Sequence, residues 1–314
     1  MTAGRTSNRL QRYLARRFVT LLSQDTSGIP PWLPIVAKGD TPGLYLPGDA
    51  PWVVHADFAT LVGGVRALLI QALHPGSLAG VKEHSRYQSD PLGRLAGTIR
   101  WLTITTFGSV DAVKAEAGRV NRLHEHVTGE YHTATGETRP YAAGDPELLL
   151  WVHIAFMESF LRTHQNYSRR PIPGGADAYV RLWAQSVEPL GLREAPRSEA
   201  ALRAEIQRFK ETGQLAANAD TREVVRFLRR PPLGRGVLVV YGALFRAAVA
   251  TIPREFLDLL GLKPQPLWFW RPVVRGLLTL MRWAVGPESP IEDAARDRLR
   301  RAGIADPHPA PPIG

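Results

Sequence analysis

Apolar residues recur at helical spacing along most of the chain, so the hydrophobic pattern predicts an all-α fold. Four segments carry the strongest pattern, at 55–74, 91–106, 109–130 and 148–167. Shorter helical segments follow at 176–188, 198–213, 221–228, 236–250, 253–260, 268–285 and 291–302. We find no alternating run of apolar and polar residues long enough to build a sheet, and no internal repeat. The pattern therefore predicts one large helical bundle.

Residues with clear capping chemistry mark several helix starts. Asp90 and Asp145 each precede a proline, and Ser109 follows a glycine, which is typical of helix N-termini. Stretch 28–51 is rich in proline and glycine and predicts an ordered loop, and the polar stretch 129–144 predicts another. The chain thus divides into an amphipathic first helix within 1–27, one helical domain over 28–302, and a disordered tail over 303–314.

Segment 109–130 carries a histidine on its apolar face. The residues on that face, at a period of 3.6, are Val113, Ala117, Val120, His124 and Val127. His126 falls on another side of the helix, so we predict that His124 points into the core and that His126 does not. A buried imidazole needs a hydrogen-bond partner or a metal, because an unpaired buried polar group costs about 1–3 kcal/mol.

Three other histidines are candidates for the same role. His153 shares a helix face with large apolar residues, so we predict that it is buried; His74 ends a helix, and His84 lies in the turn after it. Three interpretations stay open from the residues alone. These side chains are hydrogen-bonded core histidines, direct metal ligands, or the source of one axial ligand to a haem, and the first is the commonest fate of a lone histidine on an apolar face.

Arg94 and Thr98 lie four residues apart and therefore face the same way on the preceding helix. One interpretation is a surface arginine and a hydroxyl that bonds its own helix. The other is a pair that contacts a propionate or an oxygen ligand, because arginine offers a fixed fork of donors and threonine a rotatable one.

Composition excludes several kinds of chemistry. The chain has no cysteine, so disulfides, iron–sulfur clusters and thiolate-held metals are excluded. Phosphate-binding glycine loops, the HExxH zinc motif and the GxSxG nucleophile motif are absent. The net charge is +10, from 39 Lys and Arg against 29 Asp and Glu, but the arginines form no single stripe and no DNA-binding motif is present. We expect no nucleic-acid partner.

The N-terminal segment alternates apolar residues with arginines and has no continuous apolar core of the kind that a secretion signal needs. No uncharged run reaches the roughly 20 residues of a membrane span. We expect a soluble, cytoplasmic protein whose contact with membranes is at most peripheral. Segment 268–285, with its tryptophans and arginines, is the best candidate for such contact.

Several ordered blocks of the chain resemble a known family. The blocks are VGGVRALLIQALHPGSLAGVKEHS, DPLGRLAGT, FGSVDAVKAEAGRVNRLHEHVTG and YAAGDPELLLWVH. They lie within 52–167, over a third of the chain, and resemble the latex-clearing-protein and MpaB-like oxygenase family, also known as the rubber oxygenase catalytic domain. The resemblance implies an all-α, globin-reminiscent bundle that holds a b-type haem through one proximal histidine.

The resemblance also implies roles for particular residues. His124, within the pattern VxxxHxxVxG, corresponds to the proximal ligand of the haem iron, and His153 corresponds to a histidine that supports the haem pocket. Arg94 and Thr98 correspond to the family's pair on the distal helix. By sequence, Glu83 is the nearest carboxylate that could remove an allylic proton from an alkene on the distal side.

One position departs from the rubber-cleaving members of the family. They can carry a lysine over the iron just before the threonine, and this chain has Gly97 there. Those members also tend to be exported, whereas we find no secretion signal in the N-terminal segment. Polyisoprene is therefore a poor candidate for the substrate.

We accordingly hypothesise a haem b-dependent oxygenase or oxidoreductase that takes O₂ or peroxide and an apolar small molecule. The alternative is a non-enzymatic helical protein that binds haem or an apolar ligand, with or without a membrane surface. The sequence gives no indication of the oligomeric state.

Overall fold

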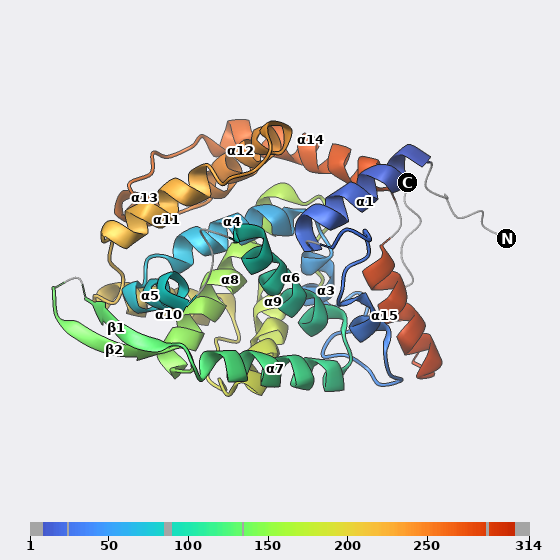
Figure 1. Ribbon diagram of the computed structural model, residues 1–314, viewed down its shortest axis with the longest axis horizontal. Helices are drawn as coiled ribbons and strands as arrows, with labels where there is room; N and C mark the ends of the chain where they lie inside the picture. The colour runs from blue at the N-terminus through green and yellow to red at the C-terminus, as the bar shows by residue number, and fades with distance from the viewer. Residues whose placement is uncertain (1–8, 24, 85–89, 134, 287–288, 305–314) are drawn as a thin grey trace.

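The computed structural model describes residues 9–23, 25–84, 90–133, 135–286 and 289–304, and these residues form a mostly helical body (Figure 1). Its first half contains α1 (Arg9–Ser23), α2 (Leu33–Ala37), α3 (Ala50–His55), α4 (Ala59–Gln71), α5 (Pro75–His84), α6 (Pro91–Phe107), α7 (Val110–His124), β1 (Thr128–His132), β2 (Thr138–Ala142) and α8 (Pro146–Tyr167). Its second half contains α9 (Gly175–Trp183), the 3₁₀ helix η1 (Ala184–Leu190), α10 (Glu199–Glu211), α11 (Ala219–Arg229), α12 (Arg235–Ala250), α13 (Arg254–Leu260), α14 (Leu267–Val285) and α15 (Pro290–Arg301).

Helices α4 and α8 pack along each other at the centre of the fold, and α12 packs on another side of α4. Gly63 allows this approach, because a Cβ atom there would lie 2.6 Å from Cδ1 of Phe160 and 2.8 Å from Oγ1 of Thr163. Leu69 of α4 and Trp151 of α8 are fully buried. The two helices that the apolar pattern marks most strongly therefore form the core.

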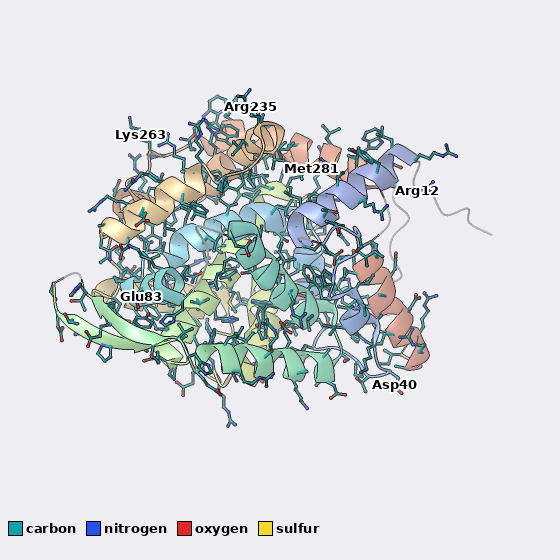
Figure 2. The ribbon with its side chains drawn as sticks, viewed as in Figure 1. Arg12, Asp40, Glu83, Arg235, Lys263 and Met281 are labelled. Atoms are coloured by element: carbon teal, nitrogen blue, oxygen red, sulfur yellow. The ribbon has the colours of Figure 1, made fainter. Side chains whose placement is uncertain are left out.

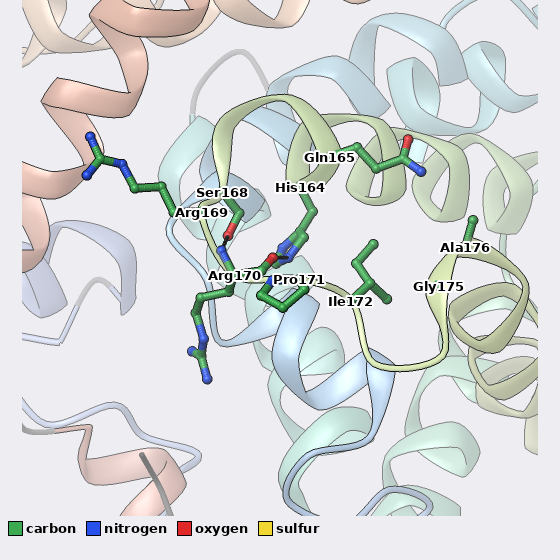
Figure 3. Close-up of a pocket in the computed structure, with 9 residues that line it drawn as sticks. All are labelled: His164, Gln165, Ser168, Arg169, Arg170, Pro171, Ile172, Gly175 and Ala176. Carbon is green, nitrogen blue, oxygen red and sulfur yellow. Dashed lines mark hydrogen bonds between the residues drawn. The ribbon is translucent and has the colours of Figure 1, made fainter. Parts of the chain in front are cut away.

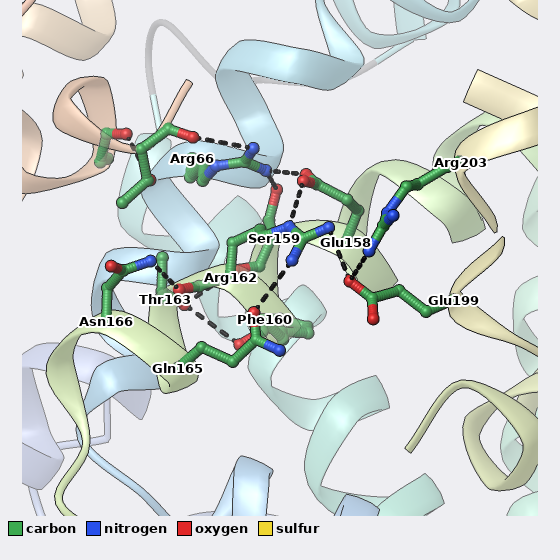
Figure 4. A network of polar contacts seen from close by, with 12 residues as sticks. Arg66, Glu158, Ser159, Phe160, Arg162, Thr163, Gln165, Asn166, Glu199 and Arg203 are labelled. Carbon is green, nitrogen blue, oxygen red and sulfur yellow. Dashed lines mark hydrogen bonds and ion pairs between the residues drawn. The ribbon is translucent and has the colours of Figure 1, made fainter. Parts of the chain in front are cut away.

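A polar network fastens the same two helices where they leave the core (Figure 4). Arg66 of α4 is 1% exposed and pairs with Glu158 of α8, and its Nη1 also donates to Oγ of Ser159 at 2.8 Å. Arg162 lies between Glu158 and Glu199, which connects α8 to α10. Because a buried arginine without a carboxylate would be costly, this network fixes the position of α4 on α8.

The predicted helix starts agree with the capping bonds in the structure. Asp90 accepts a hydrogen bond from the amide of Gly93 at 2.9 Å, and Ser109 accepts one from Ala112 at 3.2 Å. Asp145 accepts one from the amide of Glu147 at 2.8 Å. The prediction of an all-α fold is confirmed in its main point, since helices form nearly all of the regular structure that the described residues contain.

The prediction for 109–130 and 129–144 is wrong in detail. Helix α7 ends at His124, and β1 pairs with β2 as an antiparallel hairpin in which Gly129 opposes Tyr141. Only five residues make each strand, and the sequences TGEYH and TRPYA contain no alternating run of apolar residues, so the sequence pattern gave no strand signal. The hairpin is the only sheet among the described residues.

Two further predictions need correction. The expected loop over 28–51 contains the short helix α2, and the expected turn after His74 that holds His84 is instead helix α5, which starts at Pro75 and ends at His84. A proline fits the first turn of a helix, where the missing N–H has no partner to lose. Most of the predicted tail, at 305–314, and residues 1–8 of the first segment lie outside the described residues.

Among the described residues, no helix combines the length and the apolar character that crossing a membrane requires.

Neighbouring glycines on α4 provide a matched pair of variants. Gly63→Ala should lower the free energy of unfolding by about 1–3 kcal/mol, because the new methyl group has no room beside Phe160. Gly64→Ala should raise it by up to about 1 kcal/mol, because a Cβ there meets no atom within 4 Å and alanine favours the helix. Urea denaturation followed by circular dichroism measures both. Equal effects of the two variants would contradict the packing described for Gly63.

Candidate functional site

A buried carboxylate holds α6 against α7 and so fixes the two helices that carry most of the predicted site. Glu116 of α7 is 3% exposed and accepts hydrogen bonds from Nη2 of Arg100 at 2.7 Å and from Nη2 of Arg119 at 2.6 Å. Burial alone would raise the pKa of Glu116, but the hydrogen bonds from both arginines outweigh burial and lower it. The carboxylate is therefore ionised and fully paired, as charged hydrogen bonds favour.

His124 is the last residue of α7 and is half-buried. Its Nδ1 is enclosed by the protein and has no hydrogen-bond partner among the described residues. Burial, and next the positive charge of Arg94, lower the pKa of this imidazole. His124 is thus neutral near pH 7 and keeps an unshared electron pair, which is the form that binds a metal. His126 is exposed, and its Nδ1 lies 2.9 Å from the carbonyl oxygen of Arg122.

Arg94 and Thr98 lie one above the other on α6, as the spacing predicts. Arg94 retains accessible surface, yet the protein around its guanidinium lowers its pKa by desolvation. Its charge acts on His124, so the structure brings these two predicted residues close together. The hydroxyl of Thr98 lies 3.4 Å from the carbonyl oxygen of Arg94, a long contact within the helix. Both side chains are therefore able to turn toward another partner.

His153 lies in the buried face of α8 and is 5% exposed. Its Nε2 is enclosed without a hydrogen-bond partner among the described residues. Burial lowers the pKa of this histidine to about 3, so the ring is neutral. A buried nitrogen without a partner costs stability, and such an atom calls for an explanation such as a ligand.

Two glycines on different helices leave space that a side chain would fill. A Cβ atom at Gly64 of α4 would meet no heavy atom within 4 Å, although the residue is only half-exposed; a Cβ at Gly97 of α6 would also meet none, and that residue is exposed. Helix α6 packs mainly on α1, α3 and α7. A planar cofactor needs close approach to backbone of this kind, and glycine is the residue that permits it.

Glu83 lies near the end of α5, beside the hairpin, and is exposed (Figure 2). Its Oε2 accepts a hydrogen bond from the hydroxyl of Tyr141 at 2.6 Å. Gly129 makes this contact possible, because a Cβ there would lie 2.8 Å from both bonded oxygens. Tyr141 therefore holds the carboxylate at a fixed place on the hairpin, while no contact joins Glu83 directly to Arg94 or His124 among the described residues.

The other histidines that the sequence singles out already have partners. His74 is buried, and its Nε2 lies 3.4 Å from Oε1 of Gln214. His84 is exposed, and its Nε2 lies 3.0 Å from the carbonyl oxygen of Thr128. Burial therefore gives no support to His84 as a candidate ligand. Among the described residues, no group of three or more histidine, aspartate or glutamate side chains could hold a metal ion.

Sequence reasoning missed His55, which is fully buried between three helices. Its Nδ1 lies 2.8 Å from Oγ1 of Thr106, and its Nε2 lies 3.0 Å from the hydroxyl of Tyr179. Burial lowers the pKa of His55 to about 3. Both nitrogens are partnered, so His55 joins α3, α6 and α9 and has no atom left for a ligand. Sequence reasoning also missed Glu116 and Tyr141. In the sequence they are only an acidic and an aromatic residue, and no motif or spacing marks either one.

Two surface pockets lie apart from the predicted residues. One, of about 370 Å³, lies between the end of α8 and the start of α9 and is lined by His164 and residues near Arg170 (Figure 3). The other, of about 630 Å³, lies between segment 34–41 and α7, beside Arg100 and Glu116. Neither is lined by Glu83, Arg94, Thr98, His124 or His153.

Comparison with known proteins identifies a family. A family model described as ER-bound oxygenase mpaB/B'/Rubber oxygenase, catalytic domain, matches residues 52–284, well over half of the chain. The match includes every predicted site residue. No curated protein and no solved structure matches the chain.

Burial of His153 predicts a specific dependence of stability on pH. The folded protein keeps this ring neutral down to about pH 3, whereas the unfolded chain binds a proton below about pH 6.5. Acid therefore favours unfolding between these values and has no effect through this group above them. Between about pH 6 and pH 4, the unfolding free energy of His153→Leu should fall less steeply with decreasing pH than that of the wild type, by about 1.4 kcal/mol per pH unit.

The control for this measurement is His126→Leu, since His126 is exposed at the end of α7. It should leave the slope unchanged in denaturant titrations at each pH. A slope for His153→Leu equal to that of the wild type would show that His153 is protonated in the folded protein.

Proposed function

Because the chain belongs to the family of ER-bound oxygenase mpaB/B' and rubber oxygenase catalytic domains, we propose that it is a haem b-dependent oxygenase that acts on an apolar small molecule. The observation that carries the proposal is His124, a neutral imidazole with an enclosed, unpartnered nitrogen beside Arg94. The unfilled space beside half-exposed Gly64, and the lack of a side chain at exposed Gly97, are compatible with it. These features fit a haem, which needs one protein ligand, a cation for its carboxylates and room for its plane.

In this proposal His124 holds the iron, and its neutral form is what the ligand role requires. An imidazole that was protonated near pH 7 would have to lose its proton first, which would weaken binding. Burial and Arg94 have already lowered the pKa of His124, so no such cost arises. His153, which is buried and neutral on α8, is our candidate for a residue that supports the haem pocket.

Arg94 has the chemistry to bind a carboxylate of the cofactor. Arg94 is exposed on α6, and its fork of donors matches a carboxylate. Thr98 can add a hydroxyl donor on the same side of α6, since its present contact with the carbonyl of Arg94 is long. Gly97 carries no side chain, so we infer that the distal side is open to O₂ and substrate.

Glu83 is our candidate for the base that accepts a proton from an apolar substrate. Its hydrogen bond from Tyr141 fixes the carboxylate and leaves its second oxygen available. The bound haem would supply the activation of O₂, and the protein supplies ligand, orientation and exclusion of water. The alternative is a protein that binds haem or an apolar ligand without turnover, and a haem-loaded protein that consumes no O₂ with any apolar alkene would favour it.

His124→Ala tests the ligand assignment. Protein expressed with a haem precursor should show a strong Soret band in the wild type, and the variant should lose or shift this band because the iron has lost its protein ligand. Added imidazole should restore it. His126→Ala is the matched control on the same helix end and should keep the wild-type spectrum. An unchanged band in His124→Ala would contradict the assignment, and a folded, colourless wild type would overturn the haem proposal itself.

Glu83→Gln tests the base. Glutamine can still accept the hydrogen bond from Tyr141, but it cannot take a proton, so O₂-dependent product formation should fall by about 10²-fold or more. The Soret band should stay unchanged. Tyr141→Phe should give a smaller loss, since it frees the carboxylate without removing it. Full activity of Glu83→Gln would exclude this residue as the base.

A further inference from the structure

Three helices that are far apart in sequence form one outer layer of the molecule. Helix α14 packs against both α1 and α12, and the three lie along the same edge of the body (Figure 1). Together they contain nine arginines and not one aspartate or glutamate. We call the outward side of α1, α12 and α14 the basic apolar face.

Large apolar side chains gather on this face. Ten large hydrophobic residues are exposed in the part of the chain that the structure describes, and eight of them lie on these three helices. They are Leu10, Tyr13, Val239, Trp268, Phe269, Val273, Leu280 and Trp283. Trp268 is 79% exposed and Trp283 is 59% exposed. Single exposed apolar residues are ordinary, but a cluster with two tryptophans marks an interaction surface.

Helix α14 is apolar on two sides, and only one of them serves the core. Val274 and Leu278 are buried against the body. Phe269, Val273 and Leu280 follow one another at helical spacing on a different side, which is exposed. The core therefore does not explain these residues, because turning the helix to bury them would expose Val274 and Leu278.

Arginines of α14 fix this helix with its apolar stripe outward. Arg282 pairs with the buried Asp57 at 2.9 Å, and Nε of Arg275 donates to the carbonyl oxygen of Asn166 at 3.0 Å. These bonds tie the flank of α14 to the body. The exposed stripe is thus a fixed feature of the fold.

The other two helices alternate basic and apolar side chains on the exposed surface. On α1, exposed Arg9 and Arg12 alternate with Leu10 and Tyr13. On α12, Arg235, Val239 and Arg246 fall on one exposed stripe. Figure 2 shows Arg12 and Arg235 on the same edge of the molecule. This mixture matches a membrane interface, where tryptophan and tyrosine lie at headgroup depth and arginine contacts phosphate.

We propose that the basic apolar face docks the protein onto the surface of an anionic lipid bilayer, with α1, α12 and α14 lying in the plane of the headgroups. The absence of acidic residues favours an anionic partner, and the exposed tryptophans and leucines favour lipid over nucleic acid, whose surface offers phosphates but no acyl layer. A second copy of this chain would bring the same arginines together and meet like-charge repulsion. This inference goes beyond the proposed oxygenase function and does not depend on haem.

Vesicle binding tests the proposal. The full chain is sedimented with phosphatidylcholine vesicles that contain phosphatidylglycerol, and with vesicles of phosphatidylcholine alone. We expect binding to the anionic vesicles that weakens with salt, and quenching of tryptophan fluorescence by brominated phosphatidylglycerol. Arg12→Gln with Arg235→Gln should weaken binding about 25-fold, at about fivefold for each arginine. Trp268→Ser with Trp283→Ser should abolish the quenching.

The matched control is Arg181→Gln with Arg193→Gln, which removes the same charge from exposed positions outside the face. This variant should bind like the wild type, and circular dichroism checks that all variants are folded. If the control variant lost binding as much as Arg12→Gln with Arg235→Gln, binding would depend on net charge alone, and this would overturn the proposal. Absence of binding to any vesicle would also overturn the proposal. So would a dimer in solution that the tryptophan variants abolish, or retention on random DNA that the same variants abolish.

Discussion

The contact between α4 and α8 is the constraint on which the other elements depend. It joins an apolar seam, where Gly63 lets the helices approach, to a buried ion pair between Arg66 and Glu158. Arg66 also donates to the carbonyl oxygen of Thr251 at 3.3 Å, at the end of α12. One side chain thus positions three helices, and removing its charge partner would leave a cation in the core, which proteins tolerate poorly. The remaining helices pack around this fixed centre.

The helical part of the fold was predictable because its signals are local. An aspartate or serine before a helix accepts a backbone hydrogen bond within three residues, so Asp90 and Ser109 could be identified from their neighbours alone. The hairpin was not predictable, because its stability comes from a distant partner. Gly129 is needed only where Glu83 and Tyr141 meet, and these residues are brought together by the fold. Likewise, no pattern in the sequence around Glu116 predicts that Arg100 of the previous helix donates a hydrogen bond to it.

In the candidate site, too, local features were predictable from the sequence and tertiary contacts were not. The inward side of α7 follows from helical spacing, and spacing alone suffices to choose His124 over His126. Whether a buried histidine is free to bind a ligand depends on tertiary partners, and here the structure separates residues that the sequence treats alike. His74 has a partner, whereas His124 and His153 retain enclosed nitrogens without one among the described residues. Their roles, the bound haem and the cytoplasmic location remain predictions.

If His124 holds a metal as proposed, its place at the end of α7 bears on how easily that metal gains or loses an electron. The last carbonyls of a helix carry a partial negative charge, equivalent to about half an electron, and it decays within a turn. A cation held by His124 would lie in this field and would be stabilised more as its charge grows, which lowers its reduction potential. Arg94 acts on the same place with the opposite sign. The ease with which a bound metal changes oxidation state would therefore depend on the balance between a helix terminus and one guanidinium.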